Sequence, residues 1–178
     1  MYQKILYMTA VVMALFMGTA LAAPRAMTVD DVAIAGIAPG NDLSYVRSIY
    51  GEPDGEKTKR LGNYPAYLVD YYGQGFVITY DIYGGVQNPL VQKIESTNAA
   101  LMMPSGIHVG MKIADVQQVF SDVQEPPHYG VKTDIQYWSP WLAITTSDGK
   151  EGVRSVIFDV DKKGVIQKII IFDRYGQD

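Results

Sequence analysis

The chain has 178 residues, a formal net charge of −4 and no cysteine. A mildly acidic chain without a basic run lacks a surface that neutralises phosphates, so we expect neither nucleic acid nor anionic lipid as a partner. The absence of cysteine excludes disulfides, thiolate chemistry and a lipidated N-terminal cysteine. Packing alone must therefore hold the fold together.

Residues 1–22 have the pattern of a secretory signal peptide. Lys4 supplies the positive start, residues 5–17 carry no charge, and Ala20-Leu21-Ala22 has the small-x-small spacing of a cleavage site. The alternative is an uncleaved membrane anchor, because the uncharged run continues to residue 23. Gly18 and the small residues around the cut favour cleavage. We therefore expect a periplasmic or secreted protein without stable membrane insertion after cleavage.

Two segments, 36–51 and 106–121, repeat one pattern 70 positions apart. Each begins with Gly-Ile-x-x-Gly and continues with aliphatic and aromatic residues in the same register. In the first copy Asn41 is a favourable N-cap, and Gly51 with Pro53 forms a stop signal, which predicts a helix over residues 42–50. The predicted apolar stripes comprise Leu43, Val46, Ile49 and Tyr50 in one helix and Ile113, Val116, Val119 and Phe120 in the other.

After each helix the apolar period changes from about 3.6 to about 2, which indicates strands. The predicted strands cover residues 66–72, 75–82 and 90–96 in the first half and 135–138, 141–146, 153–160 and 165–172 in the second. We expect an α+β fold of two tandem helix-plus-antiparallel-meander repeats, with the helices packed on one face of a curved antiparallel sheet. The expected boundaries are a leader at 23–33, repeat 1 at 34–97, a linker at 98–105 and repeat 2 at 106–178.

The repeated motif resembles that of a known fold. The pattern G-I-x-x-G-x-x-x-x-x-V-x-x-x-[YF]-G-x-P, followed by aromatic-rich strands, is similar to the repeat of the beta-lactamase-inhibitor-protein-like fold and of the SmpA/OmlA (BamE-like) outer-membrane assembly lipoproteins. Its matching residues are Gly40, Val46, Tyr50, Gly51 and Pro53 in the first copy and Gly110, Val116 and Phe120 in the second. This chain departs from both groups, because it has two copies without a lipidation cysteine and lacks the inhibitors' disulfides. The resemblance implies non-catalytic protein binding through a sheet face and specifies no partner.

Candidate catalytic and metal-binding residues are few. The two histidines, His108 and His128, have too few nitrogen or sulfur ligands beside them for a zinc site, so both are expected to be surface or loop residues. Residues 159–164 begin like a calcium loop, but Lys163 holds a ligand position and no glutamate follows at the required distance, which favours a hairpin turn. The sequence has no nucleophile elbow and no phosphate-binding glycine loop. We therefore expect no enzyme, no metal site and no cofactor.

Aromatic residues gather in residues 64–83 and 129–141. Strand alternation places Tyr67 and Tyr71 on one face of their strand, and it places Trp141 opposite Leu142. Tyrosine and tryptophan combine rigid contact area with a polar atom, which is typical of binding surfaces. The candidate binding residues are Tyr67, Tyr71, Trp138 and Trp141. The leading hypothesis is an exported module that binds an envelope or extracellular protein or peptide.

Two other functions fit the same sequence. The repeats could form a passive structural scaffold in envelope assembly, or a pocket between them could bind a small molecule or support weak hydrolysis. The aromatic residues could also simply fill the core or cover the sheet.

Overall fold

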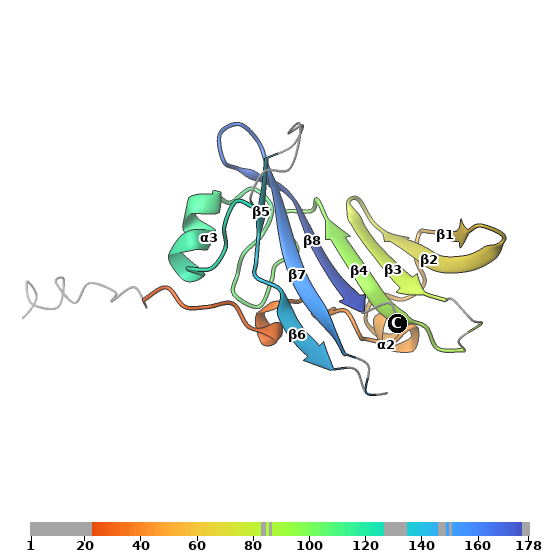
Figure 1. The fold of residues 1–178 in the computed structure, drawn as a ribbon. Helices are drawn as coiled ribbons and strands as arrows, with labels where there is room; N and C mark the ends of the chain where they lie inside the picture. The colour runs from red at the N-terminus through yellow and green to blue at the C-terminus, as the bar shows by residue number, and fades with distance from the viewer. Residues whose placement is uncertain are drawn as a thin grey trace, which may run out of the picture.

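The computed structural model describes residues 23–82, 85, 87–126, 135–145, 149 and 151–175. Within these ranges the chain is an α+β protein with an eight-stranded antiparallel sheet and two α-helices (Figure 1), which confirms the predicted class. The predicted signal peptide at 1–22 lies outside the described residues. None of the helices in the described ranges is long and apolar enough to cross a bilayer.

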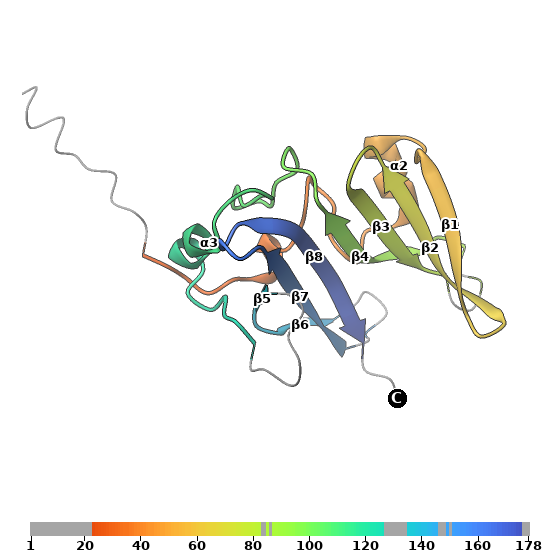
Figure 2. The ribbon, with the colours of Figure 1, turned by 90° about the horizontal axis from the view of Figure 1, so that it is seen from above.

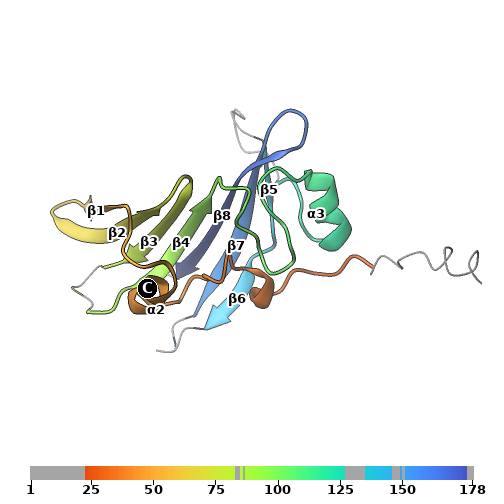
Figure 3. The ribbon, with the colours of Figure 1, turned by 180° about the vertical axis from the view of Figure 1, so that it is seen from behind.

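Each α-helix precedes a group of strands. A short 3-10 helix at Val29–Asp31 is followed by α2 (Leu43–Tyr50) and, later in the chain, by α3 (Ile113–Val119). The strands are β1 (Gly55–Leu61), β2 (Tyr64–Tyr72), β3 (Phe76–Asp81), β4 (Leu90–Ser96), β5 (Ile135–Trp138), β6 (Leu142–Thr145), β7 (Glu151–Val160) and β8 (Ile166–Tyr175). The spatial order is β1-β2-β3-β4-β8-β7-β5, and β6 also pairs with β7. The last strand, β8, thus lies in the middle of the sheet against β4 (Figures 1 and 3).

One face of the sheet carries the hydrophobic core. Val46 of α2 and Val116 of α3 are both fully buried and belong to the same core as one set of alternating strand residues. The strand residues of this core include Tyr72, Phe76, Ile78, Tyr80, Ile94, Val156, Phe158, Ile169 and Ile171. We call this side the covered face. Figure 2 shows the two helices near opposite ends of the sheet, where each one covers part of the core.

The start of α2 differs by one residue from the sequence prediction. Asp42, rather than Asn41, is the N-cap, and its Oδ1 accepts a hydrogen bond from the backbone nitrogen of Tyr45 at 2.7 Å. The Asn41 side chain instead accepts from the backbone nitrogen of Ala38 at 2.8 Å and closes the preceding turn. Gly51 ends the helix as predicted, with a φ of +74° that side chains with a Cβ rarely adopt.

The predicted apolar stripes are one position too wide in both helices. Ile49 is 47% exposed and Val119 is 37% exposed, although each was predicted to face the core. At about 100° per residue, Ile49 lies about 60° beyond Val46, on the side away from Leu43 and Tyr50. A helix this short touches the sheet along a narrow line, so the residue at that angle stays in solvent.

The segment predicted as a patternless leader is part of the fold. Met27 is 2% exposed and Val32 is fully buried in the core. The backbone nitrogen of Arg25 donates to the carbonyl of Val119 at 3.0 Å, and the nitrogen of Ser121 donates back to the Arg25 carbonyl at 3.0 Å. The leader therefore runs beside the end of α3 and connects the start of the described chain to its second half.

Strand β1 is the element that the sequence prediction missed. It consists largely of charged and polar residues, and nearly all of its side chains are exposed. It forms the outer edge of the sheet, beyond β2. Edge strands of this kind need no apolar alternation, and their lysines discourage pairing with other chains. The period-2 signal that revealed the inner strands is therefore absent from β1.

Candidate functional site

The second face of the sheet has no helix over it in the described part of the chain. The strand pairings place one set of alternating side chains there, and we call it the open face. Its residues include Lys57, Lys59, Tyr67, Val69, Tyr71, Val77, Thr79, Lys93, Glu95, Gln136, Trp138, Ser155, Ile157, Ile170 and Phe172. Val69, Thr79 and Ser155 are buried even on this uncovered side. Neighbouring side chains therefore cover parts of β2, β3 and β7 on the open face.

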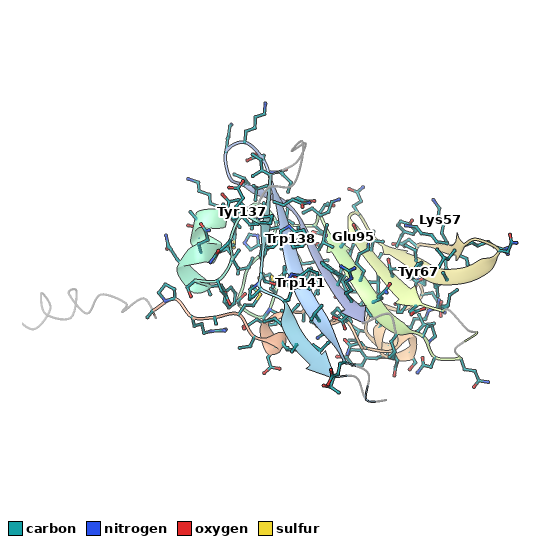
Figure 4. All side chains as sticks on the ribbon, viewed as in Figure 1. Lys57, Tyr67, Glu95, Tyr137, Trp138 and Trp141 are labelled. Atoms are coloured by element: carbon teal, nitrogen blue, oxygen red, sulfur yellow. The ribbon has the colours of Figure 1, made fainter. Side chains whose placement is uncertain are left out.

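An aromatic cluster stands at one end of the open face. The rings of Trp138 and Trp141 lie 6.2 Å apart at 63°, and the rings of Trp141 and Phe172 lie 6.1 Å apart at 88°. Both arrangements are edge-to-face, which is the favoured geometry for aromatic pairs. Trp141 is 47% exposed, so the cluster presents indole surface to solvent beside β6 and β7 (Figure 4).

Polar contacts hold this cluster in position. The indole nitrogen of Trp138 donates to the amide oxygen of Gln136 at 3.3 Å, and the Gln136 amide nitrogen donates to Asp159 at 2.6 Å. The ammonium of Lys168 lies 4.0 Å from the same carboxylate. Beside Trp138, the Ser139 hydroxyl accepts from the backbone nitrogen of Val156 at 2.9 Å. The Trp138 ring is thus fixed in orientation by its surroundings.

The structure does not bring the four predicted binding residues together. Tyr67 and Tyr71 share the open face, as predicted, but they lie on β2. Trp138 and Trp141 lie at the far end, across β3, β4, β8 and β7 (Figure 4). At about 4.8 Å per strand, β2 and β5 are about 24 Å apart along the sheet. The Lys57 ammonium lies 5.5 Å from the centre of the Tyr71 ring, so Tyr71 contacts the edge strand β1.

Phe172 is the residue that joins the two groups, and the sequence analysis missed it. It lies on β8, contacts Trp141 with its ring, and lines the same cavity as Tyr67. The sequence pattern placed residue 172 in the last predicted strand but gave no reason to prefer it to its neighbours. Its importance depends on the central position of β8, which no local pattern reveals.

A buried acidic group lies on the covered face. Asp70 is fully buried, with Arg47 of α2 at 3.8 Å and the Tyr72 hydroxyl at 3.5 Å as its contacts. Burial raises the pKa of Asp70 above its ordinary value, and the Arg47 charge opposes this shift. Arg47 also pairs with Glu52 and Glu56, each at 3.0 Å. Most of the guanidinium charge is therefore shared with exposed carboxylates.

The histidines and the calcium-like turn contribute no clustered ligands in the described part of the chain. His108 is half-buried and its Nδ1 lies 2.8 Å from the Val109 carbonyl, whereas His128 lies outside the described residues. Asp161 accepts hydrogen bonds from the backbone nitrogens of Lys163 and Val165, which closes the hairpin turn before β8. Among the described residues no group of three or more histidine, aspartate or glutamate side chains is arranged to hold a metal ion.

No family model, curated protein or solved structure matches this chain.

Proposed function

We propose that this chain is an exported, non-catalytic module that binds a protein or peptide through the open face of its sheet. One observation carries the proposal. Trp141 is half-exposed on a face that no helix of the described residues covers, and its ring contacts those of Trp138 and Phe172. An exposed tryptophan held by aromatic neighbours and hydrogen-bonded polar groups is a preformed anchor, since little side-chain entropy is lost when a partner covers it.

The same face supplies a polar rim around this anchor. Asp159 with Lys168, and Lys93 with Glu95, form ion pairs beside the apolar side chains of β8. Interfaces between proteins commonly combine an aromatic centre with a solvated, charged rim. A partner segment that packed on Trp141 would meet both kinds of surface.

The two halves of the chain also support a tandem-repeat origin. Glu95 and Ile170, which directly follow the two Val/Ile-Gln-Lys-Ile segments at 91–94 and 166–169, pair across the β4–β8 junction. Three backbone hydrogen bonds recur at matching positions in the two halves. In the first half the nitrogens of Gly40, Leu43 and Val91 donate to the carbonyls of Val91, Pro89 and Asn41, respectively. In the second half the nitrogens of Gly110, Ile113 and Ile166 donate to the carbonyls of Ile166, Gly164 and Met111, respectively. We propose that two copies of one unit are joined here about a local twofold axis, as the resemblance to the inhibitor-like and SmpA/OmlA-like repeats implies.

Export is part of the same proposal. It is supported by the pattern of residues 1–22, in which an uncharged run precedes a small-x-small site. A partner would then be an envelope or extracellular protein.

The test is a comparison of Trp141→Ala with Tyr45→Ala in capture from an envelope extract of the source cells. Tyr45 is a matched control, because it is 44% exposed but lies on α2, away from the open face. Removal of Trp141 loses two edge contacts, so we expect a stability cost of about 1 kcal/mol and an unchanged fold. The dominant captured protein should disappear with Trp141→Ala and persist with Tyr45→Ala.

Equal capture by both variants would show that the captured protein does not bind at Trp141 on the open face. A photo-crosslinking residue at position 141 and at position 45 separates a specific binder from a passive scaffold. A specific binder gives one dominant adduct from position 141, whereas a scaffold gives adducts of similar yield from both positions.

A further inference from the structure

The open face contains a cavity of about 360 Å³ between its two aromatic groups. Its walls come from β1, β2, β3, β4 and β8, so it spans the junction of the two halves of the sheet. Among the described residues it is lined by Lys59, Tyr67, Thr79, Gln92, Lys93, Phe172, Asp173 and Arg174. A volume of this order is typical of sites that accept a small molecule or a few side chains.

The lining is cationic although the chain as a whole is acidic. Lys59, Lys93 and Arg174 reach the cavity from three different strands, whereas the net charge of the chain is −4. In the described part of the chain neither Lys59 nor Arg174 has a carboxylate within ion-pair distance. Lys93 is paired with Glu95 at 3.0 Å and is therefore partly neutralised.

The acidic residue in the lining does not neutralise this charge. Strand alternation directs the Asp173 side chain to the covered face, where its two oxygens accept hydrogen bonds from Arg154 at 2.7 and 2.9 Å. Asp81 pairs with Tyr67 in the sheet register, but it is not among the lining residues. Among the lining residues, Lys59 and Arg174 thus carry positive charge that no ion pair opposes in the described part of the chain.

The apolar lining connects the cavity to the aromatic cluster. Phe172 forms part of the cavity and also contacts the ring of Trp141. Tyr67 stands across the cavity on β2, and Thr79, which is 7% exposed, lies between them. Arg174 follows Phe172 by two residues and therefore lies on the same face of β8. A ligand that places an apolar group on Trp141 and Phe172 thus meets the Arg174 side of the cavity within the next residue or two of its chain.

We propose that this cavity receives the carboxylate of an aspartate or glutamate side chain on the bound protein or peptide, beside an apolar side chain that packs on Trp141 and Phe172. This inference rests on the proposed function, because it specifies the chemistry of the partner at the same face. The guanidinium of Arg174 can accept a carboxylate in two-point geometry, and Lys59 adds a second charge from the opposite wall. The acidic side chain selects the partner segment, and the tryptophan supplies apolar contact.

The experiment uses NMR titration of the nitrogen-15-labelled protein with two capped peptides, Ac-Phe-Glu-Glu-NH2 and Ac-Phe-Gln-Gln-NH2. The indole signals of Trp138 and Trp141 report on the aromatic cluster, and the backbone amides of Thr79, Lys93 and Arg174 report on the cavity. The variants are Lys59→Gln with Arg174→Gln, and a control with Lys57→Gln and Arg60→Gln. The control also removes one lysine and one arginine charge, but both are on β1 and outside the cavity lining.

We expect the acidic peptide to bind at least about fivefold more tightly than the amide peptide, which corresponds to a charge contact at a partly solvated site. The cavity variant should remove this preference, and the control variant should retain it. Equal binding of the two peptides, retention of the preference by the cavity variant, or no binding of the acidic peptide would overturn the cavity assignment. The wild type could also prefer the acidic peptide while its indole signals stay unchanged. That result would overturn the role of the tryptophans and leave the cavity assignment in place.

Discussion

Arg154 and Asp173 form a buried two-point ion pair across β7 and β8. The Nε of Arg154 lies 2.7 Å from Oδ1 of Asp173, and its second nitrogen lies 2.9 Å from Oδ2. The same guanidinium donates to the Pro39 carbonyl at 2.5 Å. The pair therefore ties two strands of the second half to the loop that precedes α2 in the first half, and its side chains are at most 10% exposed.

Breaking this pair from one side should destabilise the protein strongly. Asp173→Asn leaves a buried guanidinium without its counter-charge, so we expect a loss of about 3–5 kcal/mol in the free energy of unfolding. Arg154→Met should cost a similar amount, because it removes the guanidinium from the buried Asp173 carboxylate and from the Pro39 carbonyl. Urea unfolding of both single variants measures these costs.

The double variant Arg154→Met with Asp173→Leu decides whether the pair acts as a unit. Removing both charges leaves no uncompensated ion, so the double variant should be clearly more stable than the sum of the single losses implies. Additive losses would mean that the two side chains stabilise the fold independently.

The inner strands could be predicted from the sequence because one of their faces is apolar and the other is more polar. The predicted bounds of residues 90–96 and 135–138 coincide with β4 and β5, and the alternation of Phe76, Ile78 and Tyr80 gave the covered face correctly. Strand β1 lacked that signal because its two faces are both solvated. The leader contained a Thr28-x-x-Asp31 capping box, which could have revealed its 3-10 turn.

The candidate site was predicted only in part. Alternation correctly placed Tyr67, Tyr71 and Trp141 away from the core, because that needs only the local period of two. The distance between the tyrosines and the tryptophans depends on strand order, and the insertion of β8 beside β4 is a long-range event. The same event brings Phe172 between the two groups. No local pattern contains that information.

Asp31 should make the protein more stable above its titration range than below it. Hydrogen bonds from the Arg25 guanidinium, opposed by burial and helped by Thr28, lower the pKa of Asp31 from 3.8 to about 2. A lowered folded-state pKa contributes stability above the unfolded value, and this contribution is lost as the pH falls from about 4 towards about 2. Because Arg25 is 52% exposed, we expect a contribution of about 1 kcal/mol.

The measurement is urea unfolding of the wild type and Asp31→Asn between about pH 6 and about pH 2. The variant should be less stable near neutral pH, and the difference should shrink through the acidic window. A difference that does not vary with pH would show that packing, rather than charge, carries the effect.

Any side chain at position 75 should destabilise the folded protein. The φ of Gly75 is +80°, and a Cβ there would lie 2.1 Å from Oγ1 of Thr97. Gly73 has a φ of +54° but open space around it, which makes it a matched control. Gly73→Ala should cost about 1 kcal/mol from backbone strain alone, and Gly75→Ala about 2 kcal/mol or more. Thermal unfolding measures both, and Thr97→Ala should recover part of the Gly75→Ala loss if the clash is the cause.

Asp70 should act on stability in the opposite direction to Asp31. Burial raises its pKa above 3.8, so the folded protein binds this proton more tightly than the unfolded chain does. Stability is then highest at low pH and falls as the pH rises from about 4 through the raised folded-state value. At neutral pH the ionised carboxylate is fully buried, and its Oδ1 has no hydrogen-bond partner among the described residues.

Asp70→Asn should therefore raise the free energy of unfolding at neutral pH by about 1 kcal/mol, because it removes a poorly solvated charge. Arg47 retains Glu52 and Glu56 at 3.0 Å, so its guanidinium is not left alone. Urea unfolding at neutral and at acidic pH should give a gain that disappears as the wild-type carboxyl becomes protonated. If the variant is less stable at neutral pH, the attraction of Asp70 to Arg47 outweighs the cost of its burial, and the pair is a stabilising contact between α2 and β2.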